Sequence, residues 1–142
     1  MSRNAVMVTG ASGGIGFACA RDLLLAGFYV AASDIAEIPA TLVNEKRCLP
    51  ISFHVVSEVD CKTAVSEACK KFGGPSALIH FAGIHHTKTW TSLTARDFNR
   101  VLEVNVTGSF FDSSSGSATH VKKWRRHSPH RVCRSGIGRC RR

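Results

Sequence analysis

The fold is decided by Thr9-Gly10-Ala11-Ser12-Gly13-Gly14-Ile15-Gly16, a glycine-rich stretch close to the N-terminus of the 142-residue chain. An apolar run at residues 5–8 precedes it, and apolar residues with helical spacing follow it over residues 15–26. A glycine-rich loop that ends a strand and opens a helix is where a parallel α/β sheet binds the phosphates of a dinucleotide.

Three glycines of this loop have distinct expected roles. Gly10 allows the tight turn, Gly14 lets the backbone approach a pyrophosphate, and Gly16 permits close packing of helix on strand. The N-terminus of the helix then presents free N–H groups to the phosphates. The alternative is a glycine-rich turn that binds no ligand.

The alternation of strand and helix continues to about residue 111. Apolar runs predict four strands, at residues 5–8, 28–32, 51–56 and 77–81. Helical spacing predicts helices at residues 15–26 and 60–72, and a longer one that Thr94 caps. Strands separated by helices predict a doubly wound parallel α/β sheet of the Rossmann type, with right-handed crossovers.

Asp34 lies at the end of the second predicted strand. A carboxylate at this place accepts hydrogen bonds from the adenosine ribose hydroxyls and repels the 2′-phosphate of NADP. No Arg or Lys follows nearby, and Gly13 brings no positive charge into the loop. The sequence therefore favours NAD over NADP. The alternative is that Asp34 only caps the segment that follows.

Three segments resemble the short-chain dehydrogenase/reductase family. The spacing Thr-Gly-x-x-x-Gly-x-Gly of residues 9–16 is similar to that family's cofactor loop. Residues 80–83 stand in the place of its Asn-Asn-Ala-Gly segment and match it in Ala-Gly, while residues 104–108 resemble the segment that carries its active-site Asn. The resemblance covers residues 4–111.

The resemblance implies an NAD-dependent oxidoreductase that moves a hydride between nicotinamide and an alcohol/ketone pair. Asn105 is the only active-site position of the family with a counterpart here. The implied cofactor-binding residues are Gly10, Ser12, Gly13, Gly14, Ile15, Gly16, Asp34, Val55, Ala82 and Gly83.

The chain also departs from the family pattern. His54 stands where family members often place an Asp that holds the adenine amino group, which leaves the backbone of Val55 for that contact. His80 and Phe81 replace two Asn residues that brace the central sheet in the family. A His at the end of a buried strand is expected to be a packed, hydrogen-bonded residue rather than a catalyst.

The family's catalytic pair has no counterpart in these 142 residues. The family uses a Tyr as general acid/base, with a Lys four residues later that lowers the phenol pKa. The single tyrosine, Tyr29, is followed four residues later by Ser33. We therefore expect a catalytically incomplete chain whose sheet stops after about four strands, with an open edge that favours self-association.

The net charge of +9 is concentrated at one end of the chain. Residues 1–111 carry ten Lys/Arg against nine Asp/Glu, and residues 112–142 carry nine against one. We therefore expect a dinucleotide-binding region over residues 1–111 and a basic tail over residues 112–142 that is disordered or an aberrant, frame-shifted terminus.

Two functional alternatives exist for the basic tail. A nucleic-acid tether is the less favoured one, built from Lys122, Lys123, Trp124, Arg125 and Arg126. A metal site is not expected, because the spacing does not fit zinc for the group His127, His130, Cys133 and Cys140. A further alternative for the whole chain is a non-catalytic nucleotide-binding module.

Composition excludes several classes of protein. Hydrophobic residues make up 44% of the chain and charged residues 20%, as in globular proteins. No apolar run approaches the roughly 20 residues that cross a bilayer, so no membrane association is expected. The N-terminus lacks the pattern of a secretory signal, and the six cysteines are expected to be thiols in the cytoplasm.

Overall fold

The computed structural model describes residues 4–120 of the chain, with side chains described as far as residue 115. The strands in this range are β1 (Ala5–Thr9), β2 (Tyr29–Asp34), β3 (Cys48–Ser52) and β4 (Ala77–His80). The helices are α1 (Gly14–Leu25), α2 (Ala40–Val43), α3 (Glu58–Phe72), the 3-10 helix η1 (Trp90–Ser92), α4 (Ala95–Leu102), the π-helix η2 (Glu103–Thr107) and α5 (Gly108–His120).

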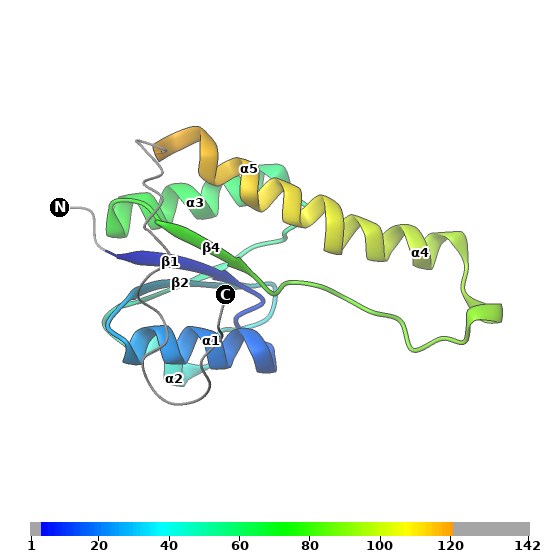
Figure 1. The fold of residues 1–142 in the computed structure, drawn as a ribbon, viewed down its shortest axis with the longest axis horizontal. Helices are drawn as coiled ribbons and strands as arrows, with labels where there is room; N and C mark the ends of the chain where they lie inside the picture. Colours follow the sequence, from blue (N-terminus) through cyan, green and yellow to red (C-terminus); the bar gives the residue numbers. More distant parts are fainter. Residues whose placement is uncertain (1–3, 121–142) are drawn as a thin grey trace, which may run out of the picture.

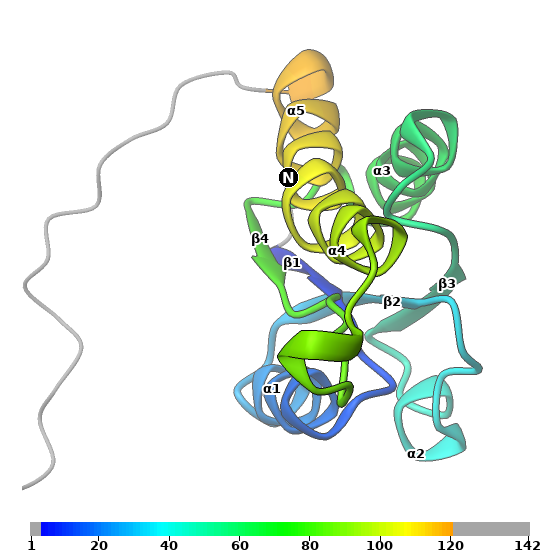
Figure 2. The ribbon, with the colours of Figure 1, turned by 90° about the vertical axis from the view of Figure 1, so that its right-hand side faces the viewer.

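The four strands form one parallel sheet in the order β3-β2-β1-β4. Helices α1 and α2 cover one face, and α3 with the continuous α4–η2–α5 helix covers the other (Figures 1 and 2). The register aligns Thr9 with Ser33 on one side and with His80 on the other. The predicted doubly wound parallel α/β fold is confirmed.

Each face of the sheet has its own hydrophobic core. Every residue of β1 is buried, and its side chains alternate between the two faces, as in a central strand covered by helices on both sides. The core on the α3 side includes Ala5, Met7, Ala31, Ile51, Val65 and Phe72. The core on the α1 side includes Val6, Val8, Val30, Ala32, Ala20, Leu24 and Leu42.

Local signals set both ends of α3 and the start of α4. The Ser57 hydroxyl accepts the backbone N–H of Asp60 at the start of α3, and Gly73 ends that helix in the left-handed conformation with φ of 86°. Thr94 caps α4 as predicted, because its hydroxyl accepts the N–H of Asp97 and the Asp97 carboxylate accepts the N–H of Thr94. This reciprocal pair is a capping box.

Two predicted elements were wrong in their details. The third strand was predicted at residues 51–56, but β3 ends at Ser52, and the side chains of Phe53 and Val55 are buried in the loop that follows. These residues are apolar because they are buried in the loop, and their apolar run was therefore interpreted as part of a strand. The apolar spacing predicted for the first helix begins at Ile15, but the side chain of Ile15 is 73% exposed, whereas Gly16, Ala20 and Leu24 are buried.

The long helix crosses the composition boundary at residue 112. Asp112 and Ser115 of α5 are both buried, so the helix packs on the sheet beyond this boundary. The tail residues assigned to a nucleic-acid tether or a metal site, from Lys122 to Cys140, lie outside the described residues.

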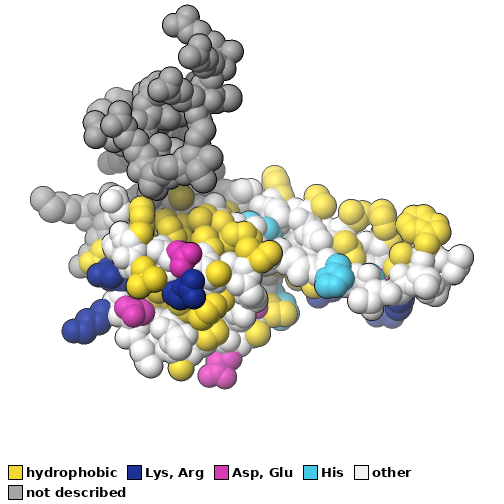
Figure 3. Space-filling view, turned by 60° about the horizontal axis from the view of Figure 1, so that its bottom comes forward, with side chains coloured by type: hydrophobic (Ala, Val, Ile, Leu, Met, Phe, Trp, Pro, Cys, Tyr) yellow, Lys and Arg dark blue, Asp and Glu magenta, His cyan; other side chains and the backbone are white. Residues whose placement is uncertain are grey.

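The arm formed by η1 and α4 extends beyond the sheet (Figure 1) and carries hydrophobic side chains at its surface (Figure 3). They include Trp90 and Phe98, which are 84% and 55% exposed. Over the described part of the chain, every helix is too short or too polar to cross a membrane.

Candidate dinucleotide site

The glycine-rich loop is shaped by close backbone contacts. Gly10 has φ of 69°, and a Cβ there would lie 2.7 Å from the backbone of Phe81 and Ala82. A Cβ on Gly16 would overlap the carbonyl oxygen of Gly10. These two positions therefore require glycine for steric reasons that do not depend on any ligand.

Gly14 is a glycine for a different reason. Apart from its chain neighbours and the backbone of its own helix, no atom lies within 4 Å of the place where its Cβ would stand, so the position opens to space rather than to packed protein. Gly13 is the N-cap of α1 and its cap has no side-chain hydrogen bond, which leaves the first N–H groups of the helix without intrahelical acceptors. An open backbone with free N–H groups at a helix N-terminus suits a phosphate.

Asp34 is joined to the loop by hydrogen bonds. Its Oδ2 accepts the backbone N–H of Ser12 at 2.9 Å, and its Oδ1 accepts the N–H of Ala36 at 3.1 Å. The Ser12 hydroxyl donates to the carbonyl of Glu37 at 2.9 Å. Asp34 thus caps the segment after β2, and each carboxylate oxygen still has a lone pair for a ribose hydroxyl.

A cavity of about 200 Å³ lies at the carboxyl edge of the sheet, between the loop and α4. It brings together six of the predicted cofactor-binding residues, namely Gly10, Gly13, Asp34, Val55, Ala82 and Gly83. Ser12, Gly14, Ile15 and Gly16 lie beside it on the loop and at the start of α1. His54, at the family's adenine position, also lines the cavity.

Other lining residues carried no signal in the sequence. Ile35 and Val56 follow strands β2 and β3, while Ile84 follows β4. Arg100 and Val104 reach the cavity from the long helix. Their presence depends on how that helix crosses the sheet edge, which no local pattern predicts. Arg100 is the only Lys or Arg among the lining residues of this cavity.

Asn105 fixes the segment after β4. Its side-chain Oδ1 accepts the N–H of Ile84 at 2.8 Å, and its Nδ2 donates to the carbonyl of Ile84 at 2.9 Å. A Cβ on Gly83 would lie 3.3 Å from the same Oδ1. Asn105 belongs to the π-helix η2, a type of helix that is frequent at functional sites.

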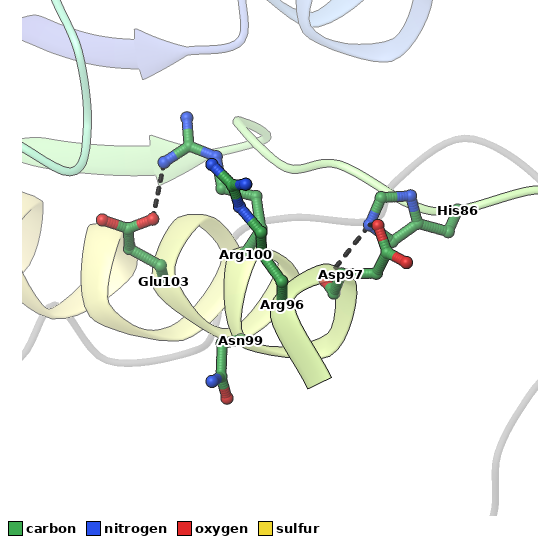
Figure 4. Close-up of a pocket in the computed structure, with 6 residues that line it drawn as sticks. All are labelled: His86, Arg96, Asp97, Asn99, Arg100 and Glu103. Atoms are coloured by element: carbon green, nitrogen blue, oxygen red, sulfur yellow. Dashed lines mark hydrogen bonds and ion pairs between the residues drawn. The ribbon is translucent and has the colours of Figure 1, made fainter. Parts of the chain in front are cut away.

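A second and larger hollow, of about 640 Å³, lies on the arm (Figure 4). Its lining is polar and includes His86, Arg96, Asp97 and Glu103. Hydrogen bonds from Lys88 and Thr94 hold the pKa of the Asp97 carboxyl well below its usual value. Arg100 pairs with Glu103 at 2.6 Å and lines both hollows.

Tyr29 lies away from this edge of the sheet. It begins β2, whose other end carries Asp34, and its ring packs against Phe72 with the centroids 5.2 Å apart. Parallel strands bring only their carboxyl ends to the dinucleotide edge. Tyr29 is therefore not placed to act as general acid on a ligand of the cavity.

Comparison with known proteins gives consistent matches. A family model described as short chain dehydrogenase matches residues 4–124. A short-chain dehydrogenase/reductase of Armillaria gallica is 34% identical over 113 residues, which are 73% of this chain and 43% of that protein. L-2,3-butanediol dehydrogenase of Corynebacterium glutamicum is 28% identical, over 78% of this chain and 46% of its own length.

Solved structures agree with the sequence relatives. Ligand-free aldohexose dehydrogenase from Thermoplasma acidophilum superposes with a TM-score of 0.71 at 27% identity, covering 82% of this chain and 44% of that one. A glucose/ribitol dehydrogenase-type protein from Brucella melitensis gives 0.75 at 26% identity, covering 82% and 54%. The chain spans less than half the length of the curated relatives it matches.

Proposed function

The chain belongs to the short-chain dehydrogenase family, and from this premise we propose that it binds NAD at the carboxyl edge of its sheet. The observation that carries the proposal is the cavity that joins the glycine loop to Asp34 and Val55. The open backbone at Gly14 and the free N–H groups of α1 suit the pyrophosphate. The carboxylate of Asp34 suits the adenosine ribose.

The proposed preference for NAD over NADP rests on charge. A 2′-phosphate on the ribose would stand against the carboxylate of Asp34, and like charges in contact are strongly disfavoured. Arg100 lines the same cavity, but its guanidinium pairs with Glu103 at 2.6 Å. Asp34 is therefore the charge that decides between the two cofactors.

For the reaction, we propose hydride transfer between nicotinamide and a small alcohol/ketone pair. This chain supplies the part of the family's fold that binds the cofactor. The nicotinamide, when bound, supplies the hydride chemistry. Asn105 positions the segment after β4 through its two hydrogen bonds to Ile84. The 142 residues contain no Tyr-x-x-x-Lys, so we expect this chain alone to bind cofactor without turnover.

Two further properties belong to the same proposal. Strand β4 is an edge of the sheet formed by the described strands, and an open edge favours pairing with another chain, so we propose self-association. We propose the cytoplasm as the compartment, since thiols such as those of Cys48 and Cys61 persist where the environment is reducing.

Calorimetric titration of the full chain with NAD and NADP tests the function. We expect NAD to bind and NADP to bind at least about tenfold more weakly. Asp34→Asn, which keeps the shape of the side chain and removes its charge, is expected to narrow that difference. The matched control is Asp22→Asn, because Asp22 is an exposed acid on α1 that pairs with Arg21. Tighter binding of NADP, or no binding of either cofactor, contradicts the proposal.

A further inference from the structure

A buried pair of side chains joins β4 to α5 next to the glycine loop. Nδ1 of His80 lies 2.7 Å from Oδ2 of Asp112 and 2.9 Å from the hydroxyl of Thr9. Thr9 and His80 are the last residues of β1 and β4 and lie side by side in the sheet. The prediction that His80 is a packed, hydrogen-bonded residue is confirmed.

The pair is shielded from solvent. The side chain of Asp112 is 1% exposed and that of His80 is 18% exposed. Nδ1 of His80 thus lies within hydrogen-bond distance of two oxygen atoms, Oδ2 of Asp112 and Oγ1 of Thr9. Oδ1 of Asp112 and Nε2 of His80 have no hydrogen-bond partner among the described residues. The contact with the imidazole of His80, at 2.7 Å, is therefore the ion pair that Asp112 forms within the described residues.

The thiol of Cys61 on α3 also interacts with the carboxyl group of Asp112. Burial raises the pKa of Cys61 to about 12, and the charge of Asp112 is the next contributor. The carboxylate thus stands among β4, α3 and α5 rather than at the surface. Removal of one member of a buried pair is costly, because it leaves the other member without its partner.

The backbone after His80 touches the glycine loop directly. The N–H of Phe81 donates to the carbonyl of Thr9 at 3.1 Å, and the N–H of Ala82 donates to the Thr9 hydroxyl at 3.4 Å. A Cβ on Gly10 would lie 2.7 Å from the same backbone, so the two segments leave no room to slide. The position of His80 therefore sets the position of Gly10.

We propose that His80 and Asp112 are positioning residues for the dinucleotide loop. The pair holds the ends of β1 and β4 in register, and the register fixes Gly10 and the free N–H groups behind it. Neither residue lines the cavity, so they act through Thr9 and the backbone at 81–82. The inference rests on the proposed binding of a dinucleotide and adds the device that shapes its site.

The test compares binding with stability in the full chain. We expect Asp112→Asn to raise the Kd for NAD about tenfold, the equivalent of one hydrogen bond to a charged group. Val65→Ala is the matched control, because it removes two methyl groups from the core on the α3 side and Val65 does not line the cavity. It is expected to lower stability and leave Kd unchanged. His80→Asn, alone or combined with Asp112→Asn, is expected to lose no more affinity for NAD than Asp112→Asn alone. The reason is that the two residues act as one unit.

A variant with both polar groups removed separates positioning from folding. Replacement of a buried pair by apolar residues often leaves stability unchanged or raised. The double variant His80→Leu with Asp112→Leu is therefore expected to fold, yet to bind NAD more weakly because the hydroxyl of Thr9 loses its contact with the imidazole. Unchanged Kd in this folded variant and in Asp112→Asn overturns the proposal.

Hydrogen exchange distinguishes this proposal from the proposed function. Without any ligand, the amides of residues 10–13 are expected to exchange faster in Asp112→Asn than in Val65→Ala. If the parent chain binds neither cofactor, the proposed function fails, and the exchange rates still decide whether the pair positions the loop. Equal exchange in both variants contradicts the positioning role.

Discussion

The side-chain amide of Asn105 clasps the backbone of Ile84, accepting its N–H at 2.8 Å and donating to its carbonyl at 2.9 Å. One residue of the π-helix η2 thereby fixes the segment that leaves β4 toward the arm. The amide uses its oxygen and one N–H in this contact. Its contribution in this chain is therefore first of all structural.

Asn105→Ala is expected to lower the free energy of unfolding by about 1–2 kcal/mol, because two hydrogen bonds are lost at an exposed site. Chemical denaturation measures the change. Asn99→Ala is the matched control on α4, as no hydrogen bond to its side chain is found among the described residues. Equal stability of the two variants contradicts the structural role.

The glycines of the loop give a paired prediction. Gly10→Ala is expected to destabilise the fold by more than about 2 kcal/mol, because φ is 69° and the new Cβ would meet the backbone of Phe81 and Ala82. In Gly14→Ala the new methyl group lies in open space at a helical position, so stability is expected to change by less than about 1 kcal/mol.

Affinity for NAD gives a second prediction for Gly14. The methyl group of Gly14→Ala occupies the space into which a pyrophosphate would approach, so we expect lower affinity for NAD in a variant of normal stability. Thermal unfolding and calorimetric titration of this variant give the two numbers. Normal affinity together with normal stability would show that the phosphates do not approach Gly14.

The loop and its flanking elements were predictable because their signals are local. The strand, the turn at Gly10 and the opening of α1 occupy consecutive residues, and the glycine spacing is set by backbone sterics. The end of β2 at Asp34 and the cap at Thr94 were predicted for the same reason.

Contacts between distant segments were not predictable from the sequence. The partner of His80 lies 32 residues away on α5, and Arg100 reaches the cavity only because α4 passes the sheet edge. The short helix α2, of four residues, was missed because one turn is too short for an apolar period. The burial of Phe53 and Val55 beyond β3 likewise depends on tertiary packing.

The capping box of α4 predicts a dependence on pH. Hydrogen bonds from Lys88 and Thr94 lower the pKa of Asp97 below its usual value of 3.8. A lowered pKa in the folded state means that the stabilisation is complete above that usual value and is lost as pH falls through the folded-state pKa. The stability difference between the parent chain and Asp97→Asn is therefore expected at neutral pH and should shrink below about pH 4.

Removal of the cap's other half tests the same box. Thr94→Ala is expected to cost about 1 kcal/mol, the usual contribution of an N-cap hydroxyl. Thr91→Ala in η1 is the control, since Thr91 lies on the arm but caps no helix of eight or more residues. For Asp97, a stability difference between the parent chain and Asp97→Asn that grows as the solution is acidified would contradict the lowered pKa of its carboxyl group.

Two cysteines are expected to resist alkylation. Burial raises the pKa of Cys48 to about 11 and that of Cys61 to about 12, so neither forms a thiolate at neutral pH. Mass spectrometry after brief treatment with iodoacetamide is expected to find both unmodified in the folded chain and modified after denaturation. Rapid native labelling of Cys61 contradicts the packing of α3 against α5.

Hydrogen exchange of the full chain with and without NAD locates the bound dinucleotide on the chain. If NAD binds at the carboxyl edge of the sheet, exchange is slower at residues 10–16, at residues 34–36 and at residues 53–56, the segments that form or adjoin the cavity. Protection confined to other segments, such as the polar hollow around His86 and Arg96, or no protection at saturating NAD, would contradict it.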